Sequence, residues 1–436
     1  MVKFAQLPKY EAYKDSEFPW VGMIPCEWEV STLGNCLFPV SIKNYPDYPL
    51  LSITRELGVI ERDIEDTNSN HNFIPDDLTG YKLLRQGQFG MNKMKAWQGS
   101  YGVSKFTGIV SPAYFVFEFT KSINPDYFNW AIRSQLYISY FGSASDGVRI
   151  GQWDLSKSRM KGIPFLLPSE QEQTFIANFL DQKTAQIDAA TAIKEQQIEL
   201  LKERKQIIIQ QAVTQGLDPN VPMKDSGVDW IGMIPAHWDL VKLGSCLSPV
   251  SVKNSPELPL LSITREQGVI ERDVDDQESN HNFIPDDLSG YKKLEKGQFG
   301  MNKMKAWQGS YGVSKFTGIV SPAYFVFDFT KAINPEFFNW AIRSKLYVSF
   351  FGSASDGVRI GQWDLSKARM KVIPFVLPSE EEQLLIAKHL DEKLEQVDVA
   401  IKIKLQQIER LREYRSSLIN SAVTGKIKIT PEMIEQ

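Results

Sequence analysis

The chain has 436 residues, of which 42% are hydrophobic and 23% charged, as in soluble globular proteins with more than one domain. No window approaches the roughly 18 apolar residues of a membrane-spanning helix, and the polar N-terminal residues lack a secretory signal, so we expect a cytoplasmic protein without membrane contact. Cys26, Cys36 and Cys246 match neither a disulfide framework nor a zinc spacing, and the net charge of −4 argues against a protein that attracts nucleic acid over its whole surface.

Residues 1–165 form the first predicted domain. Apolar, β-prone runs recur at 49–54, 87–91 and 108–117, and turn-forming residues separate them. One helix is predicted after Asn124, because Asn is a good N-cap, Pro125 suits the first helical position and an apolar run follows. We therefore expect a compact α+β domain.

Residues 166–214 are predicted to form a long helix, followed by a polar, turn-rich linker at 215–229. Apolar residues recur at steps of three and four, and 176–212 contains neither Gly nor Pro. A helix of about 40 residues would be about 60 Å long at 1.5 Å per residue. Such a helix cannot bury its apolar stripe alone, so we expect a partner helix.

The second half of the chain repeats the first with an offset of 210 residues. It predicts a second α+β domain at 230–375, a second long helix at 376–425 and a C-terminal tail at 426–436. Residues 87–117 are identical to 297–327, and 69 of 80 positions agree between 81–160 and 291–370. The long helices agree at only 19 of 40 positions between 174–213 and 384–423. The chain is thus predicted to carry two near-identical domains.

The obvious partner of each long helix is its own copy. We favour an antiparallel coiled-coil pair over two helices packed separately on their own domains, because the apolar pattern is longer than in a normal globular helix. The candidate helix-pairing residues are Ile187, Ile198, Leu201, Ile208, Val397, Ile401, Ile408, Leu411 and Leu418. The same stripe includes Leu405.

Several segments resemble catalytic motifs but lack residues that those motifs require. NPDYF at 124–128 and NPEFF at 334–338 lack the second proline of the adenine methyltransferase motif, and helix capping explains these residues. GSASDGVR at 142–149 lacks the Lys and Ser/Thr of a phosphate-binding loop, and the four histidines are scattered. We therefore expect no catalytic residue, no metal and no cofactor in this chain.

Positive charge is concentrated inside both domains. Residues 79–117 contain five basic and no acidic residues, and 289–327 contain six basic residues and one acid. Lys can neutralise phosphates, and Asn and Gln can pair with adenine edges, so we favour DNA contact over a merely solvated loop. The first-domain candidates are Lys82, Arg85, Asn92, Lys93, Lys95, Gln98, Ser100, Tyr101, Lys105, Arg149, Lys157 and Arg159. The second-domain candidates are Lys292, Lys293, Asn302, Lys303, Lys305, Gln308, Ser310, Tyr311, Lys315, Arg359, Lys367 and Arg369.

Three pairs of motifs, in the same order in both halves, resemble the specificity subunits of type I restriction-modification systems over nearly the whole chain. KDSEFPWVGMIPCEWEV (14–30) and KDSGVDWIGMIPAHWDL (224–240) look like the opening of a recognition domain. IPFLLPSEQEQTFIANFLDQKT (163–184) and IPFVLPSEEEQLLIAKHLDEKL (373–394) look like the entry into a conserved helix. LLKERKQIIIQQAVTQG (200–216) and RLREYRSSLINSAVTGK (410–426) look like the end of that helix.

The resemblance implies two target recognition domains and two conserved helices packed antiparallel. Each domain would read one half of a bipartite site in double-stranded DNA, and the helices would set the spacing. Two methyltransferase subunits would bring S-adenosylmethionine, and restriction-motor subunits would use ATP and Mg. The chain itself would not be an enzyme.

This sequence departs from the family because its two domains are nearly the same, whereas family members usually carry two different ones. Antiparallel helices imply an approximate two-fold relation, so we expect an inverted-repeat target with a spacer. Two alternatives are the specificity subunit of a related system whose methylation and cleavage functions share one polypeptide, and a coiled-coil scaffold that binds proteins. A self-contained methyltransferase ranks last, because its cofactor and catalytic motifs are missing.

Overall fold

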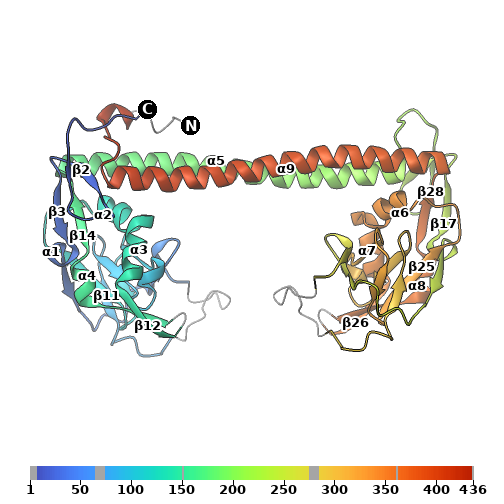
Figure 1. The fold of residues 1–436 in the computed structure, drawn as a ribbon, viewed down its shortest axis with the longest axis horizontal. Helices are drawn as coiled ribbons and strands as arrows, with labels where there is room; N and C mark the ends of the chain where they lie inside the picture. The colour runs from blue at the N-terminus through green and yellow to red at the C-terminus, as the bar shows by residue number, and fades with distance from the viewer. Residues whose placement is uncertain (1–6, 64–73, 150–151, 274–283, 360–361, 435–436) are drawn as a thin grey trace. The chain divides into compact units, whose positions relative to one another are not determined.

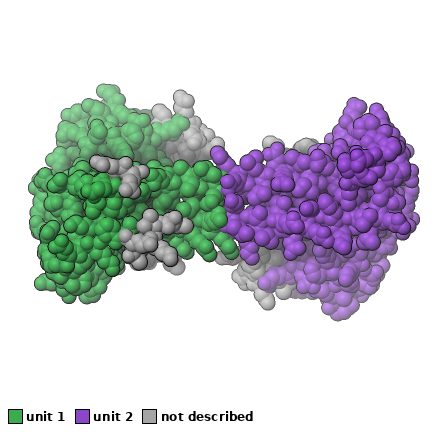
Figure 2. Space-filling model, turned by 90° about the horizontal axis from the view of Figure 1, so that it is seen from above, with its two compact units in different colours: residues 1–194, 406–436 green, residues 195–405 purple. Residues whose placement is uncertain are grey.

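A computed structural model describes residues 7–63, 74–149, 152–273, 284–359 and 362–434. The chain divides into two compact units, residues 1–194 with 406–436 and residues 195–405, which Figure 2 shows in green and purple. Each unit combines a strand-rich domain with parts of two long helices, α5 (Glu170–Gln215) and α9 (Glu380–Val423). The predicted α+β class, with two strand-rich domains and two long helices, is confirmed (Figure 1).

The two strand-rich domains contain corresponding elements in the same chain order. The first contains β1 (Tyr13–Asp15), β2 (Met23–Pro25), β3 (Glu29–Thr32), α1 (Leu33–Cys36), β4 (Leu37–Val40), β5 (Leu51–Thr54), β6 (Gly58–Glu61), β7 (Lys82–Leu84), β8 (Phe89–Met91), η2 (Ala96–Gln98), β9 (Tyr101–Val103), β10 (Gly108–Val110), β11 (Phe115–Phe119), α2 (Pro125–Ile132), α3 (Gln135–Ser143), β12 (Ser145–Arg149), β13 (Gln152–Leu155), α4 (Lys157–Lys161) and β14 (Pro164–Leu167). The second contains β15 (Met223–Asp225), β16 (Met233–Pro235), β17 (Asp239–Lys242), η3 (Leu243–Ser245), β18 (Leu247–Val250), β19 (Leu261–Thr264), β20 (Gly268–Glu271), β21 (Lys292–Leu294), β22 (Phe299–Asn302), η4 (Ala306–Gln308), β23 (Tyr311–Val313), β24 (Gly318–Val320), β25 (Tyr324–Phe329), α6 (Pro335–Ile342), α7 (Lys345–Ser353), β26 (Ser355–Arg359), β27 (Gln362–Leu365), α8 (Lys367–Val372) and β28 (Pro374–Leu377).

A four-stranded antiparallel sheet forms the centre of each domain, with strand order β4-β11-β8-β9 in the first and β18-β25-β22-β23 in the second. In the first domain Met91 lies opposite both Tyr101 and Phe115. Phe89, on the same strand, is fully buried against the rings of Phe117 and Phe128. The sheet is therefore held to α2 by an aromatic core.

The helix predicted after Asn124 is two helices, which corrects the sequence prediction. Asn124 caps α2 as expected, because its side chain accepts hydrogen bonds from the backbone of Asp126 and Tyr127. The helix stops at Arg133, and Ser134 takes an extended conformation before α3 begins. The Arg133 guanidinium donates hydrogen bonds to the backbone carbonyls of residues 55, 56 and 101, so the break anchors a turn and a strand of the domain.

The two long helices pack side by side within each unit (Figure 1). In the first unit, Leu180 of α5 shares a core with Leu418 of α9, and Asp188 lies 3.4 Å from Arg415. As the residue number rises along α5 it falls along α9, so the helices are antiparallel in this unit. In the second unit Lys205 of α5 forms the corresponding ion pair, 2.7 Å from Asp398.

The nine candidate helix-pairing residues all lie at least partly inside. Ile187, Ile198, Val397, Ile408, Leu411 and Leu418 are buried, and Leu201, Ile208 and Ile401 are half-buried. Leu405 is different, because 54% of its surface is exposed. The stripe read from the sequence therefore includes one leucine outside the buried seam, because the regular steps of three and four place the half-buried Lys404 in the seam between Ile401 and Ile408.

A glutamate in the first turn of each long helix joins the helix to its domain. Glu172 accepts hydrogen bonds from the indole of Trp28, at 3.1 Å, and from the hydroxyl of Tyr10. Its counterpart Glu382 accepts from Trp238 at 3.0 Å and lies 2.9 Å from His237 Nε2. Burial alone raises the pKa of Glu382, but the hydrogen bonds from Trp238, His237 and Ser379 together lower it below its ordinary value of 4.5.

The pKa of Glu382 predicts a pH-dependent contribution to stability. A carboxyl whose pKa is lowered in the folded state stabilises that state above its unfolded pKa, and the contribution disappears as pH falls through the folded pKa. We therefore expect Glu382→Gln to melt below the unchanged chain at pH 7, with the difference shrinking below about pH 4.5. Thermal unfolding from pH 7 to 3 measures this, and Glu381→Gln, an exposed neighbour, serves as control. A constant difference across this range would contradict the role of the carboxylate.

The predicted linker and tail are both structured where they are described. The linker at 215–229 contains β15, which pairs with β16. In the tail, Ile427 and Ile429 are each 3% exposed in the core of the first unit, and the backbone N–H of Lys428 donates to Pro8 O at 2.8 Å. The C-terminal segment is thus part of the first unit, ending in η5 (Pro431–Met433).

Gly425 makes the turn between α9 and this segment. Its φ is +70°, and an added Cβ would lie 2.3 Å from Cδ of Pro25. We expect Gly425→Ala to lower the melting temperature of the first unit by more than Gly22→Ala does. Gly22 has a similar φ of +72° but open space around it, so that variant carries only the backbone strain of about 1–2 kcal/mol. Equal shifts in calorimetry would show that the contact with Pro25 is unimportant.

Candidate nucleic-acid interface

The segment 92–100 is a tight loop between β8 and β9. The Asn92 side chain accepts from the backbone of Met94 at 3.2 Å, and its backbone N–H donates to Ser100 O at 3.0 Å. Gly99 has a φ of +91°, which favours glycine and lets the chain turn from the 3-10 helix η2 into β9. The loop is therefore a closed, hydrogen-bonded turn that carries the half-buried Lys93 and the exposed Lys95.

Three of the predicted DNA-contacting positions in each domain are buried, which corrects the sequence interpretation. Tyr101 is fully buried, its ring centre lies 4.6 Å from that of Phe141, and burial raises its pKa. Asn92 and Ser100 close the loop from inside, at 9% and 3% exposure. The corresponding Asn302, Ser310 and Tyr311 are buried in the same way. These side chains support the loop and do not present a surface to DNA.

The remaining candidates lie at or near the surface. In the first domain Arg85, Lys95, Lys105, Lys157 and Arg159 are exposed, and Lys82, Lys93 and Gln98 are half-buried. In the second domain Lys305, Lys315, Lys367 and Arg369 are exposed, and Lys292, Lys293, Lys303 and Gln308 are half-buried. Arg149 and Arg359 end β12 and β26, and their side chains lie outside the described residues.

Lys293 forms an ion pair within its own domain, and the first domain has a leucine at the equivalent position. Its ammonium group lies 2.6 Å from Glu295, whereas Leu83 at the equivalent position is buried. The pair compensates one charge of the second basic stretch. Lys293 is therefore a weaker DNA candidate than the sequence suggested.

Four lysines from separate segments form a cluster on the first domain. Lys82 starts β7, and its ammonium group donates to Tyr114 O at 2.6 Å. Burial lowers the pKa of Lys82, and the positive charges of Lys43, Lys157 and Lys93 lower it further. These four residues are here called the lysine cluster. Lys253, Lys292, Lys303 and Lys367 repeat it in the second domain.

Lys43 is the member of the cluster that sequence reasoning missed. It stands between β4 and β5, outside the basic stretch, and only the fold brings it to Lys82. The one available signal was its repetition as Lys253. Lys157, at the start of α4, is held with its ammonium group 4.8 Å from the centre of the Phe115 ring, and Lys367 lies 4.5 Å from that of Phe325.

A cluster of four like charges is costly unless an anion neutralises it. Burial is the main cause of the lowered pKa of Lys82 and Lys292, and the neighbouring like charges lower it further because they disfavour the charged form. A polyanion such as duplex DNA would reverse this penalty, because each neutralised phosphate releases condensed counterions. The described residues contain no group of three or more His, Cys, Asp or Glu placed to hold a metal.

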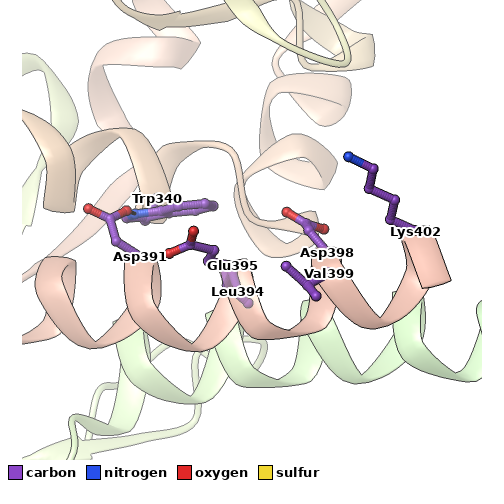
Figure 3. Close-up of a pocket in the computed structure, with 7 residues that line it drawn as sticks. All are labelled: Trp340, Asp391, Leu394, Glu395, Asp398, Val399 and Lys402. Atoms are coloured by element: carbon purple, nitrogen blue, oxygen red, sulfur yellow. Dashed lines mark hydrogen bonds between the residues drawn. The ribbon is translucent and has the colours of Figure 1, made fainter.

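A pocket on the second unit has the opposite charge and differs between the two copies. Trp340, Asp391, Glu395 and Asp398 line it together with Leu394, Val399 and Lys402 (Figure 3). The Trp340 indole donates to Asp391 at 2.9 Å, as Trp130 does to Asp181 at 2.8 Å. The first copy carries Ala185, Ala189 and Ala192 where this one has Glu395, Val399 and Lys402. Three carboxylates against one lining lysine make this pocket less suited to DNA phosphates than the lysine cluster.

No protein-family model matches the chain. The type I restriction enzyme MjaX specificity subunit of Methanocaldococcus jannaschii is 25% identical over 295 residues, which are 64% of this chain and 63% of that relative. The chain is thus similar in sequence to a type I specificity subunit. The match spans less than two thirds of the relative's length, and it confirms the resemblance predicted from the sequence motifs.

Two solved structures share the fold of this chain. One belongs to a study of complex assembly and conformational transition of the type I restriction-modification system, with a TM-score of 0.66 and 13% identity over 92% of this chain and 98% of that one. The other is the HsdS subunit from Thermoanaerobacter tengcongensis, with a TM-score of 0.54 and 13% identity over 93% of this chain and 98% of that one.

Among the described residues, no helix combines the length and the apolar character that a membrane span requires.

Proposed function

We propose that this chain is the non-catalytic DNA-recognition subunit of a type I restriction-modification complex. The observation that carries the proposal is the lysine cluster, which recurs with the same residue types in both domains of a chain related to specificity subunits. Four lysines whose charges affect one another, brought together from four separate segments, suit the phosphates of a duplex. Lys95 and Lys105, with Lys305 and Lys315, are further exposed lysines of the two basic stretches.

The target is an inverted repeat with a spacer. The stretch 87–117, which includes the loop between β8 and β9, is identical to 297–327, so both domains offer the same side chains to base edges. Identical readers select identical half-sites, and the two copies of such a site stand on opposite strands when the readers are related by a two-fold axis.

The long helices serve as the docking site for the partner subunits. In type I systems the modification subunits bring S-adenosylmethionine and the restriction subunits use ATP with Mg, so this chain needs no cofactor of its own. One of the structures with this fold comes from work on assembly of the type I system, which supports partners of that kind. These reactions take place in the cytoplasm, where the complex meets DNA.

Selection from a random pool of duplexes tests the proposal. The purified full chain with its cognate methyltransferase is incubated with the pool, and bound sequences are recovered and read. We expect two identical half-sites in inverted orientation. Two unrelated half-sites would refute identical readout, and weak, sequence-independent binding with steep salt dependence would favour the scaffold alternative.

A further inference from the structure

The segment between β4 and β5 presents seven consecutive exposed residues, 43–49, here called the 43–49 loop. The fold fixes it at both ends. Ile42 O accepts from the Leu83 N–H at 2.8 Å, Asn44 N–H donates to Thr79 O at 3.1 Å, and Pro49 O accepts from the Ile109 N–H at 2.9 Å. These bonds attach the loop to β7 and β10, and β7 also holds Lys82.

Two tyrosines in this loop are exposed to solvent. Tyr45 and Tyr48 are 39% and 42% exposed, and their ring centres lie 5.8 Å apart at 75°. The Tyr48 N–H also donates to Tyr45 O at 3.3 Å, which closes a turn between them. The pair is therefore preorganised, so little conformational freedom is lost when a ligand binds. Each ring offers a hydroxyl donor and an apolar face.

The second domain builds the same loop without the tyrosines. Val252 O accepts from the Lys293 N–H at 2.8 Å, Asn254 N–H donates to Ser289 O at 3.1 Å, and Pro259 O accepts from the Ile319 N–H at 2.9 Å. Asn44 and Asn254 share a positive φ, at 69° and 62°. Ser255 and Leu258 stand where the first domain has Tyr45 and Tyr48. The two loops therefore share a backbone and differ in the aromatic pair.

The charges of the two loops are the same. Lys43 and Asp47 of the first loop correspond to Lys253 and Glu257 of the second. Lys43 is the member of the lysine cluster that begins the loop, so a polyanion bound at the cluster would pass next to the tyrosines. Because the charges match, the main chemical difference between the loops is the exchange of Tyr45 and Tyr48 for Ser255 and Leu258.

We propose that Tyr45 and Tyr48 contact the sugar-phosphate backbone of duplex DNA, so that the first domain binds its half-site more tightly than the second. The inference rests on the proposed function. Tyrosine hydroxyls are common donors to phosphate oxygens, and such contacts add affinity without carrying base sequence. The half-sites would thus be identical in sequence but unequal in strength.

Exchanging the residues between the two loops tests this inference. The probe is a duplex of several helical turns, about 40 base pairs, that carries the site selected from the random pool. We expect Tyr45→Ser with Tyr48→Leu to weaken binding about tenfold, as the loss of hydrogen bonds to a charged group implies. Ser255→Tyr with Leu258→Tyr should strengthen binding by a similar factor, and all four substitutions together should restore the original affinity.

Salt dependence separates this contact from that of the lysines. The tyrosines are uncharged, so the slope of log affinity against log salt should stay the same in all three variants. Unchanged affinity of the Tyr45→Ser, Tyr48→Leu variant would overturn the inference. If thermal unfolding shows that this variant is damaged, the gain of affinity in the Ser255→Tyr, Leu258→Tyr variant decides. A pool that yields no selected site at all would instead defeat the proposed function.

Discussion

Replacing Lys43, Lys157, Lys253 and Lys367 with glutamine weakens duplex DNA binding by about 100-fold or more at physiological salt, if each lysine neutralises one phosphate. All four are exposed, and they form two of the four positions of the lysine cluster in each domain. The slope of log affinity against log salt becomes shallower by about 3 to 4, because each lost phosphate contact contributes about 0.9. Fluorescence anisotropy at several salt concentrations measures both quantities.

The matched control is an equal loss of charge on the long helices. Lys202, Lys388, Lys393 and Lys402 are exposed there, and their replacement with glutamine gives the same net charge. We expect less than about a threefold change in affinity, because exposed charges beyond a Debye length of the bound DNA are screened. Equal weakening by the two variants would mean that net charge, and not the cluster, governs binding.

Leu418→Ala lowers the free energy of unfolding by about 2–5 kcal/mol, the range for a buried leucine that leaves a cavity. Leu418 is 1% exposed and shares the core of the first unit with Leu180 and Ile187 of α5. The loss affects the packing between the two helices and hardly affects the helix itself, because Leu and Ala have similar helix propensities. Urea unfolding followed by circular dichroism measures the change.

Leu405→Ala is the control on the same helix. The sequence places Leu405 in the same apolar stripe, but 54% of its surface is exposed. We expect a change within about 0.5 kcal/mol, as for surface substitutions in general. If the two alanine variants lost the same stability, the antiparallel packing of α5 against α9 would not be what buries Leu418.

The sequence predicted best those helices that have a regular apolar period or a clear N-cap residue. The long helices follow from uninterrupted steps of three and four residues, and Asn124 caps α2 as its neighbours implied. The break at Ser134 was missed, because it depends on hydrogen bonds from Arg133 to carbonyls distant in sequence. A helix cap depends on residues that are neighbours in the sequence, whereas the hydrogen bonds of Arg133 form only in the folded domain.

The candidate site was predicted at the level of segments and less well at the level of residues. A mixture of Lys, Asn, Ser and Tyr between 92 and 105 indicated contact with DNA, but residue type does not show side-chain direction. Tyr101 points into the core, and Asn92 closes its own loop. Lys43 joins the cluster only because Ile42 is hydrogen bonded to β7. Contacts of this kind join residues that are far apart in the sequence. The only sequence signal for Lys43 was that the second half of the chain repeats it as Lys253.

Sequencing the methylome of cells that express this chain with its cognate methyltransferase, against cells that lack the chain, tests the central claim most directly. We predict a new adenine motif, made of two identical half-sites in inverted orientation around a gap, that is present only with the chain. An asymmetric motif would retain the role in recognition but refute identical readout by the two domains. Identical methylation with and without the chain would contradict its function as the specificity subunit.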